Sequence, residues 1–218
     1  MPAAELEPLD LRGFSERLEA VREGVPQLGT AALHRLHSHY EELRRWAPRL
    51  DLIGPGAAAE IFRRHYGEAL EALDWLPAGA FRLVDVGSGA GFPGFVLAAA
   101  RPDAEVWLVE PRHKRLAFLA AAARRAGLAV HAVDARVAAS QPLPLPEPID
   151  VVTIRAVRLP PRDLSALARR LDPGGRLIVW EGGEAISLPP ELRPGRRRRL
   201  AGSEARYLAE YLPASRSS

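Results

Sequence analysis

The stretch VDVGSGAGFPG, residues 84–94, places four glycines and an acid, Asp85, between a short apolar run and a helix-like segment. Glycine has no Cβ atom, so at this density backbone amides can lie directly against a ligand. In open α/β sheets the first strand-to-helix turn is the expected ligand site. The alternative is a tight turn that uses glycine only for left-handed backbone angles. We predict a small-molecule site here.

Two classes of ligand compete for this turn. Residues 89–94 satisfy the dinucleotide pattern G-x-G-x-x-G, and Glu110 follows about twenty residues on, where a ribose-binding acid belongs. However, Asp85 at the strand tip would repel a pyrophosphate. A cationic ligand without phosphate removes this conflict, and S-adenosylmethionine carries a sulfonium and an ammonium group. We therefore predict S-adenosylmethionine as the cofactor, with a nicotinamide dinucleotide as the alternative.

The side chains around the turn have predicted parts in holding this cofactor. Gly87 and Gly89 open the turn and admit the methionine and ribose portions. Asp85 favours the nearby positive charge, directly or through water. Glu110 accepts two hydrogen bonds from the ribose diol, and Phe92 supplies an apolar wall.

The elements that must position this turn follow from periodicity. An apolar stripe recurs at spacings of three and four, at Leu33, Leu36, Tyr40, Leu43 and Ala47. This period predicts an amphipathic helix from about Thr30 to Pro48, and a second helix is predicted over residues 57–73. We assign residues 1–79 to an N-terminal helical extension and residues 80–218 to a second domain.

From residue 81 the period changes to short, β-branched runs. These runs are residues 81–86, 104–110, 128–133, 149–154 and 175–180. Helix-like segments separate the earlier runs, and this alternation predicts a parallel sheet with helices on both faces. The tail after Gly182 is expected to be irregular and to close with an antiparallel strand over 205–212. The predicted fold is α/β: a Rossmann-like, mostly parallel seven-stranded sheet of the class I methyltransferase type.

Composition limits the class of protein. The 218 residues include no cysteine, which excludes disulfides, thiolate metal sites and cysteine nucleophiles. No apolar run approaches the roughly 20 residues that span a bilayer, and the acidic N-terminal stretch does not resemble a signal peptide. We expect a cytoplasmic monomer with no membrane partner.

Histidines and tryptophans lie in patterns that could bind a metal or stack on bases. His34 and His37 share a helix face, but His39 points elsewhere and no acid completes a metal site. We expect no bound metal and a solvated or packing role for these histidines. The tryptophans all lie in apolar contexts and are expected in the core: Trp46, Trp75, Trp107 and Trp180.

Basic residues gather in two places, although the formal net charge is only +3. The denser cluster is Arg193 with Arg196, Arg197, Arg198 and Arg199, and a second patch is Arg112, Lys114 and Arg115. Contact with RNA phosphates is one interpretation. A solvated charge run in a loop is the other, and the sequence leaves both open.

Two catalytic features of other methyltransferases are absent from the sequence, and their absence limits the type of substrate. The Asn/Asp-Pro-Pro-aromatic motif common in enzymes that methylate exocyclic amines is missing, because TIRAV (residues 153–157) follows the fourth apolar run. Methylation of pyrimidine carbons through a covalent adduct needs a cysteine nucleophile. Guanine N7 needs neither feature, since it has a free lone pair and no proton to lose. Placement of N7 in line with the methyl group is then sufficient.

These motifs together resemble the bacterial small-subunit ribosomal RNA guanine-N7 methyltransferases, the family also called glucose-inhibited division protein B. The resemblance runs from about Leu33 to Tyr211. It is carried by WAPRLDLIG, RRHYGEAL, DVGSGAGFPG, PRHKRLAFL and IDVVTIRAV. It implies 16S ribosomal RNA or the small ribosomal subunit as the partner.

The resemblance also implies roles for individual residues. Gly87 and Phe92 would contact the cofactor, and Val137 and Ala138 would frame its adenine. Arg155 would act at the mouth shared by cofactor and substrate, as the predicted catalytic residue. Its guanidinium group can donate two parallel hydrogen bonds to a carboxylate, a phosphate or a guanine edge. The alternative role for this arginine is a structural salt bridge. His65 would touch RNA or the cofactor mouth, the alternative being a buried, hydrogen-bonded histidine.

Four positions depart from the family pattern. Asp51 and Ile53 replace an asparagine and a threonine, Ala138 replaces an acid, and Glu181 replaces a lysine. These departures keep another RNA or a small molecule open as the substrate. A nicotinamide oxidoreductase and an RNA-binding protein with a degenerate fold are the remaining alternatives.

Overall fold

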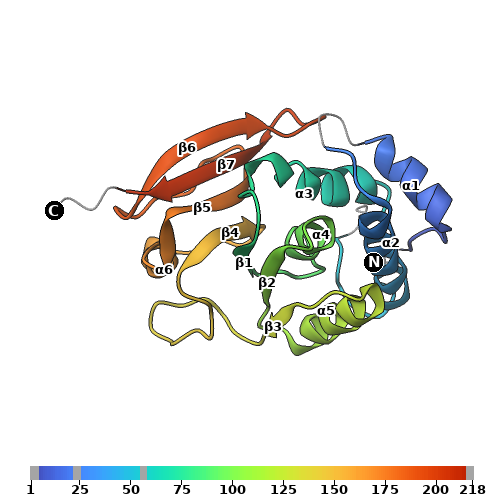
Figure 1. The fold of residues 1–218 in the computed structure, drawn as a ribbon, viewed down its shortest axis with the longest axis horizontal. Helices are drawn as coiled ribbons and strands as arrows, with labels where there is room; N and C mark the ends of the chain where they lie inside the picture. The colour runs from blue at the N-terminus through green and yellow to red at the C-terminus, as the bar shows by residue number, and fades with distance from the viewer. Residues whose placement is uncertain (1–4, 22–25, 55–57, 215–218) are drawn as a thin grey trace.

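The computed structural model describes residues 5–21, 26–54 and 58–214, which fold around a seven-stranded sheet (Figure 1). The strands are β1 (Phe81–Val86), β2 (Ala104–Val109), β3 (His131–Val133), β4 (Ile149–Arg155), β5 (Leu171–Gly182), β6 (Leu192–Arg199) and β7 (Arg206–Pro213). Their order is β3-β2-β1-β4-β5-β7-β6. Strands β1 to β5 pair in parallel, and β7 runs antiparallel to β5 and β6. The predicted fold class is confirmed.

Helices cover both faces of this sheet. They are α1 (Leu11–Glu19), α2 (Thr30–Trp46), α3 (Glu68–Leu70), α4 (Gly94–Ala100), α5 (His113–Ala126) and α6 (Pro161–Ala168). Figure 1 shows α2, α4 and α5 on one side and α6 on the other. Successive β1 side chains enter opposite cores, because strand side chains alternate. Leu83 belongs to the same cluster as Phe95 of α4, and Val84 to the same cluster as Leu164 of α6.

The helical extension packs on the α4 and α5 side of the sheet. Helix α2 has the predicted start, and Leu36, Tyr40 and Leu43 are buried as its stripe predicts, while Leu33 is only partly buried. One apolar cluster joins these residues to α4 and α5. The division of the chain between residues 79 and 80 stays a prediction.

The second predicted helix differs in its geometry. Its predicted start at residue 57 lies outside the described residues, and the chain then forms a π-helix, η1 (Ile61–Gly67). The short α3 and a 3₁₀ turn, η2 (Leu73–Trp75), follow. The prediction of one regular helix was therefore wrong. The wider π turn lets the rings of Phe62 and Tyr66 pack together in the core, with centroids 5.9 Å apart.

The sequence predicted an irregular tail after Gly182 that closes with an antiparallel strand over 205–212. The closing strand is confirmed, because β7 runs antiparallel to β5 and β6. The expectation of an irregular chain was wrong for residues 192–199. Residues 192–199 form the edge strand β6, paired with β7. The register shifts between Pro194 and Arg197, at the sheet edge where a proline is tolerated. Pairing with the following strand, β7, thus imposes a strand that local composition does not indicate.

The tryptophan prediction holds for half of the set. Trp75 and Trp180 are buried, whereas Trp46 and Trp107 are partly exposed at the margin of the core. Among the described residues, no helix combines the length and apolar character needed to cross a membrane.

Candidate functional site

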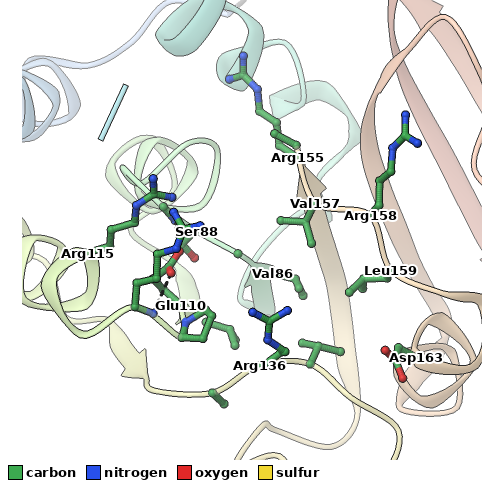
Figure 2. Close-up of a pocket in the computed structure, with 18 of the residues that line it drawn as sticks. Val86, Ser88, Glu110, Arg115, Arg136, Arg155, Val157, Arg158, Leu159 and Asp163 are labelled. Atoms are coloured by element: carbon green, nitrogen blue, oxygen red, sulfur yellow. Dashed lines mark hydrogen bonds between the residues drawn. The ribbon is translucent and has the colours of Figure 1, made fainter. Parts of the chain in front are cut away.

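A cavity of about 570 Å³ opens at the carboxyl ends of β1, β2 and β4 (Figure 2). Four segments at this edge of the sheet surround it: the glycine loop after β1, residues 110–115 after β2, the turn after β3, and the connection from β4 to α6. Leu52 and His65 of the helical extension also line it. Its volume is in the range of small-molecule sites. Because β1 has β2 on one side and β4 on the other, the cavity lies at the point where strand order reverses, as expected for an open α/β sheet.

The glycine loop is fastened to the end of β2. The backbone amides of Gly87 and Ser88 both donate to the Val109 carbonyl, at 2.8 and 3.1 Å. Gly87 has a φ of 72°, and a Cβ atom at this position would lie only 2.3 Å from Cγ2 of Val157. Both its left-handed angle and this close approach therefore require glycine. Gly87, Gly89 and Val157 all line the cavity.

Glu110 lines the cavity and is 3% exposed. Its carboxylate accepts hydrogen bonds from the backbone amides of Gly89, at 3.0 Å, and Arg112, at 2.9 Å. Each carboxylate oxygen has a second lone pair. The side chain is thus fixed by the loop and still able to accept from a diol in the cavity.

Asp85 lies behind the loop, outside the set of residues that line the cavity. Its carboxylate accepts from the Thr153 hydroxyl at 2.7 Å, and its Oδ2 has no hydrogen-bond partner. A Cβ atom on Gly94 would lie 2.5 Å from this carboxylate, so the glycine makes room for the acid. Burial raises the pKa of Asp85 to about 6. The predicted effect of Asp85 on the ligand, directly or through water, stays a prediction.

Phe92 forms a wall of the cavity, as predicted, and the helical extension supports it. Its ring packs edge-on against Tyr66, with centroids 5.0 Å apart. Nearby, His39 donates from Nε2 to the Ala90 carbonyl at 2.8 Å and accepts on Nδ1 from the Tyr66 hydroxyl at 2.7 Å. Burial lowers the pKa of His39 to about 4, so the ring is neutral. The extension thus holds the loop from behind.

The predicted packing role of the α2 histidines is confirmed for His39, and His37 bonds to the Leu9 carbonyl at 2.8 Å. His34 is exposed. Across the part of the chain that the structure describes, no cluster of histidines and acids could hold a metal.

Arg155 lines the cavity, but its guanidinium turns toward the helical extension (Figure 2). Its Nη2 atom lies 2.9 Å from the carboxylate of Glu68 and also donates to the Arg64 carbonyl. Glu68, which is 2% exposed, also pairs with Arg206 at 2.8 Å. Burial lowers the pKa of Arg155. Arg155 thus forms the structural salt bridge that was the alternative interpretation. Its catalytic role stays a prediction.

His65 also lines the cavity, with its ring centroid 4.9 Å from that of Phe92. Burial and the positive charge of Arg155 lower the pKa of His65 to about 3. The imidazole is therefore neutral and a weak base. The structure places it at the mouth, while contact with RNA stays a prediction.

Val137 and Ala138 line the far end of the cavity, where the adenine was predicted. The next backbone amide, of Ala139, donates to the Asp163 carboxylate at 2.8 Å and fixes this turn. Because this contact is made by the backbone, the missing acid at Ala138 does not disturb the turn.

The cluster of Arg193 and Arg196–Arg199 lies on β6 and not in a loop. Three of its arginines form ion pairs with acidic side chains. Arg196 pairs with Glu210 at 2.9 Å, Arg197 with Glu181 at 3.1 Å and Arg198 with Asp74 at 2.9 Å. The predicted loop is thus wrong, whereas the predicted exposure to solvent holds for Arg193, Arg196, Arg197 and Arg199. The interpretation as an RNA-binding cluster stays a prediction, weakened by these pairs.

The remaining departures from the family pattern have local roles. Glu181 is buried and accepts hydrogen bonds from Arg197 and from the Tyr211 hydroxyl. The Asp51 carbonyl accepts from Arg115 at 2.6 Å, and Ile53 is buried. Glu181 therefore stabilises the β5–β7–β6 region and is not among the residues that line the cavity.

Sequence reasoning missed several residues at this site. His39 shares its helix face with Leu36, Tyr40 and Leu43, at the three-and-four spacing that marks the buried side. That signal was available. Arg136 and Arg158, which line the cavity, are isolated in the sequence and had no such signal.

Comparison with known proteins identifies the family. The model for GidB, rRNA small subunit methyltransferase G, matches residues 32–186. The chain belongs to this family. The ribosomal RNA small subunit methyltransferase G of Desulfotalea psychrophila is 39% identical over 133 residues, covering 60% of this chain and 61% of that protein. The protein of the same name from Paramagnetospirillum magneticum is 36% identical over 163 residues, covering 72% and 70%.

Solved structures support the fold. A SAM dependent methyltransferase from Aquifex aeolicus gives a TM-score of 0.53 at 16% identity, covering 67% of this chain and 90% of that one. An rRNA methylase from Streptococcus thermophilus gives 0.52 at 14% identity, covering 69% and 97%. The predicted family and methyltransferase fold are thus confirmed. The matched part spans about 61% of the length of the Desulfotalea relative.

Proposed function

We propose that the chain transfers the methyl group of S-adenosylmethionine to N7 of a guanine in 16S ribosomal RNA. The observation that carries the proposal is the cavity at the switch point of the sheet, in a chain of the rRNA small subunit methyltransferase G family. We also propose that it acts as a cytoplasmic monomer, with residues 1–79 as the helical extension and 80–218 as the methyltransferase domain.

The residues present fit this cofactor. Glu110 would accept from the ribose diol, and Val137 and Ala138 would frame the adenine. Phe92 would exclude water from the methionine end. The buried charge of Asp85 favours a cation nearby, since its Oδ2 has no hydrogen-bond partner among the residues that the structure describes. When bound, the cofactor supplies an electrophilic methyl group on a sulfonium.

The cavity is poorly equipped for proton abstraction. Its acids, Glu110 and Asp163, both accept hydrogen bonds from backbone amides. His65 is a weak base at neutral pH, because its pKa lies near 3. A target with a free lone pair, such as guanine N7, does not require a base. This chemistry favours N7 over an exocyclic amine or a ring carbon.

The cofactor half of the proposal is tested by thermal shift with S-adenosylhomocysteine against NADH. We expect stabilisation by S-adenosylhomocysteine alone, because a diphosphate would lie near the buried Asp85. Stabilisation by NADH alone would contradict the proposal and favour the oxidoreductase alternative. If neither ligand shifts the melting temperature, the RNA-binding protein without a cofactor is favoured.

The substrate half is tested by methyl transfer from labelled S-adenosylmethionine. Small ribosomal subunits and their extracted RNA are compared with a panel of metabolites. Transfer to the RNA supports the proposal, and transfer only to a metabolite contradicts it.

A further inference from the structure

Four exposed arginines stand around the cavity on connections that follow three different strands. We propose that these mouth arginines, Arg112, Arg136, Arg158 and Arg162, form the surface on which the RNA backbone docks. The inference rests on the proposed function and adds where the substrate lies. All four line the cavity and are exposed. Figure 2 shows Arg136 and Arg158 reaching it from different segments.

The charge of the mouth arginines is not neutralised by acids of the described chain. No ion pair or side-chain hydrogen bond involves the guanidinium groups of Arg112, Arg136 or Arg158 within the described residues. Arg162 lies 3.7 Å from Asp163, but its side chain is 83% exposed and Asp163 already accepts from the Ala139 amide. Like charges that converge without counter-ions favour an anionic ligand.

The two acids of the cavity lining do not offset this charge. The lining includes six arginines and only two acids, Glu110 and Asp163. Both acids are buried and held by backbone amides. Of the other two lining arginines, Arg115 donates to the Asp51 carbonyl and Arg155 pairs with Glu68. Among the described residues, the mouth arginines therefore supply positive charge around the opening that no close acid neutralises, and Arg115 adds to it because a bond to a carbonyl leaves its charge in place.

The placement of these arginines fits a flexible single strand. Arg112 follows β2 and Arg136 follows β3, while Arg158 and Arg162 follow β4. Parallel strands bring these connections to one edge of the sheet, so the positive charge borders the cavity from more than one side. A single strand whose phosphates contact this border can lower one unstacked base into the cavity. A rigid duplex would keep its bases stacked and away from the cavity.

The test is the salt dependence of RNA binding by the full chain. The probe is a fluorescein-labelled, 20-nucleotide single-stranded RNA of mixed sequence. One variant is Arg112→Gln/Arg136→Gln and the other is Arg158→Gln/Arg162→Gln. The control that separates the two basic surfaces is Arg193→Gln/Arg199→Gln, which removes the same charge from exposed positions of β6, the other cluster for which RNA contact was predicted.

Each lost phosphate contact should lower the slope of log Kobs against log salt by about 0.7. Each mouth variant should therefore bind about 25-fold more weakly at 0.1 M salt, with a slope reduced by about 1.4. The control should change binding less than about threefold. A far-ultraviolet circular dichroism spectrum and a cooperative thermal transition like those of the wild-type protein show that all three variants remain folded.

Three outcomes overturn the inference: wild-type binding by both mouth variants, loss in only one of them, or an equal loss in the β6 control. Tighter binding of a duplex of the same length would also contradict it. The proposed function can fail independently of the docking surface. If the wild-type protein binds RNA through the mouth arginines but transfers no methyl group, the docking surface is supported and the proposed function is contradicted. If the mouth variants transfer the methyl group as well as the wild-type protein does, the proposed function is supported and the docking surface is contradicted.

Discussion

The paired β6 arginines and the mouth arginines are the same residue type and differ in whether an acid neutralises their charge. On β6, Arg196, Arg197 and Arg198 follow one another and each pairs with an acid. At the mouth, Arg136 and Arg158 are far apart in the sequence and have no carboxylate partner among the described residues. The density of positive charge along a sequence therefore does not locate the free charge. The β6 arginines should stabilise the fold, and the mouth arginines should bind a substrate.

Arg155 is an exception to this difference between the two groups of arginines. It lines the cavity, but it forms an ion pair as the β6 arginines do. Glu68→Gln should lower the free energy of unfolding by about 3 kcal/mol, since it leaves the Arg155 and Arg206 charges without a counter-ion in a buried site. Urea denaturation at pH 7 measures this effect. The control is Glu60→Gln, whose pair with Arg64 is about half exposed and should cost less than about 0.5 kcal/mol. A loss as small as that of the control would show that Arg155 is free to bind substrate.

The structural role of the β6 arginines depends on Glu210, which is 5% exposed and pairs with Arg196 and Arg176. Glu210→Gln should lower the free energy of unfolding by about 2 kcal/mol, less than Glu68→Gln because Arg196 is half exposed. Urea denaturation of Glu210→Gln and of the exposed Glu184→Gln gives the comparison. Equal stabilities would show that the β6 pairs contribute nothing and are available to RNA.

Asp85 adds a buried negative charge behind the cavity, in contrast to the positive charge at its mouth. Its ionisation should make the affinity for a cationic cofactor depend on pH. Its pKa near 6 is above the ordinary value, so ionisation costs stability as the pH rises through about 6. A sulfonium nearby would favour the ionised form. If it lowers the pKa of Asp85 by about one unit, affinity for S-adenosylmethionine relative to S-adenosylhomocysteine should rise about fivefold between pH 5 and 7.

Calorimetric titrations of both ligands at the two pH values measure this ratio. Asp85→Asn is the control and should make the ratio independent of pH, because the amide retains the hydrogen bond from Thr153 without a charge. A pH-dependent ratio that persists in Asp85→Asn would assign the effect to another group.

The smallest effect is expected on stability at the mouth. Arg158→Gln/Arg162→Gln should change the free energy of unfolding by less than about 0.5 kcal/mol, since neither side chain makes a close ion pair. Thermal denaturation compares it with Arg196→Gln, which loses the Glu210 pair. A larger loss in the mouth variant would show that these arginines hold the β4–α6 connection in place.

The sequence predicted the features that depend on neighbouring residues. The loop from Gly87 to Gly94 was found because its chemistry lies within one turn, and the sheet because its runs alternate with helices. Partners distant in the sequence were not found. Arg198 meets Asp74 across 124 positions, and Arg155 meets Glu68 across 87. No local pattern encodes such pairs, so the acids that pair with Arg196, Arg197 and Arg198 were not predictable, and neither was the partner of Arg155, although a salt bridge there was one of two alternatives. Strand β6 was missed for another reason, because its proline and its arginines do not show the apolar pattern of a strand and only its pairing with β7 defines it.

The central claim is tested most directly by mapping N7-methylguanine in 16S ribosomal RNA from cells with and without this gene. Reduction and aniline cleavage break the chain at N7-methylguanine and locate the base. We predict one site that is lost with the gene and restored by the wild-type protein, but not by a protein that lacks both pairs of mouth arginines. An identical N7-methylguanine map in the two strains would contradict the account.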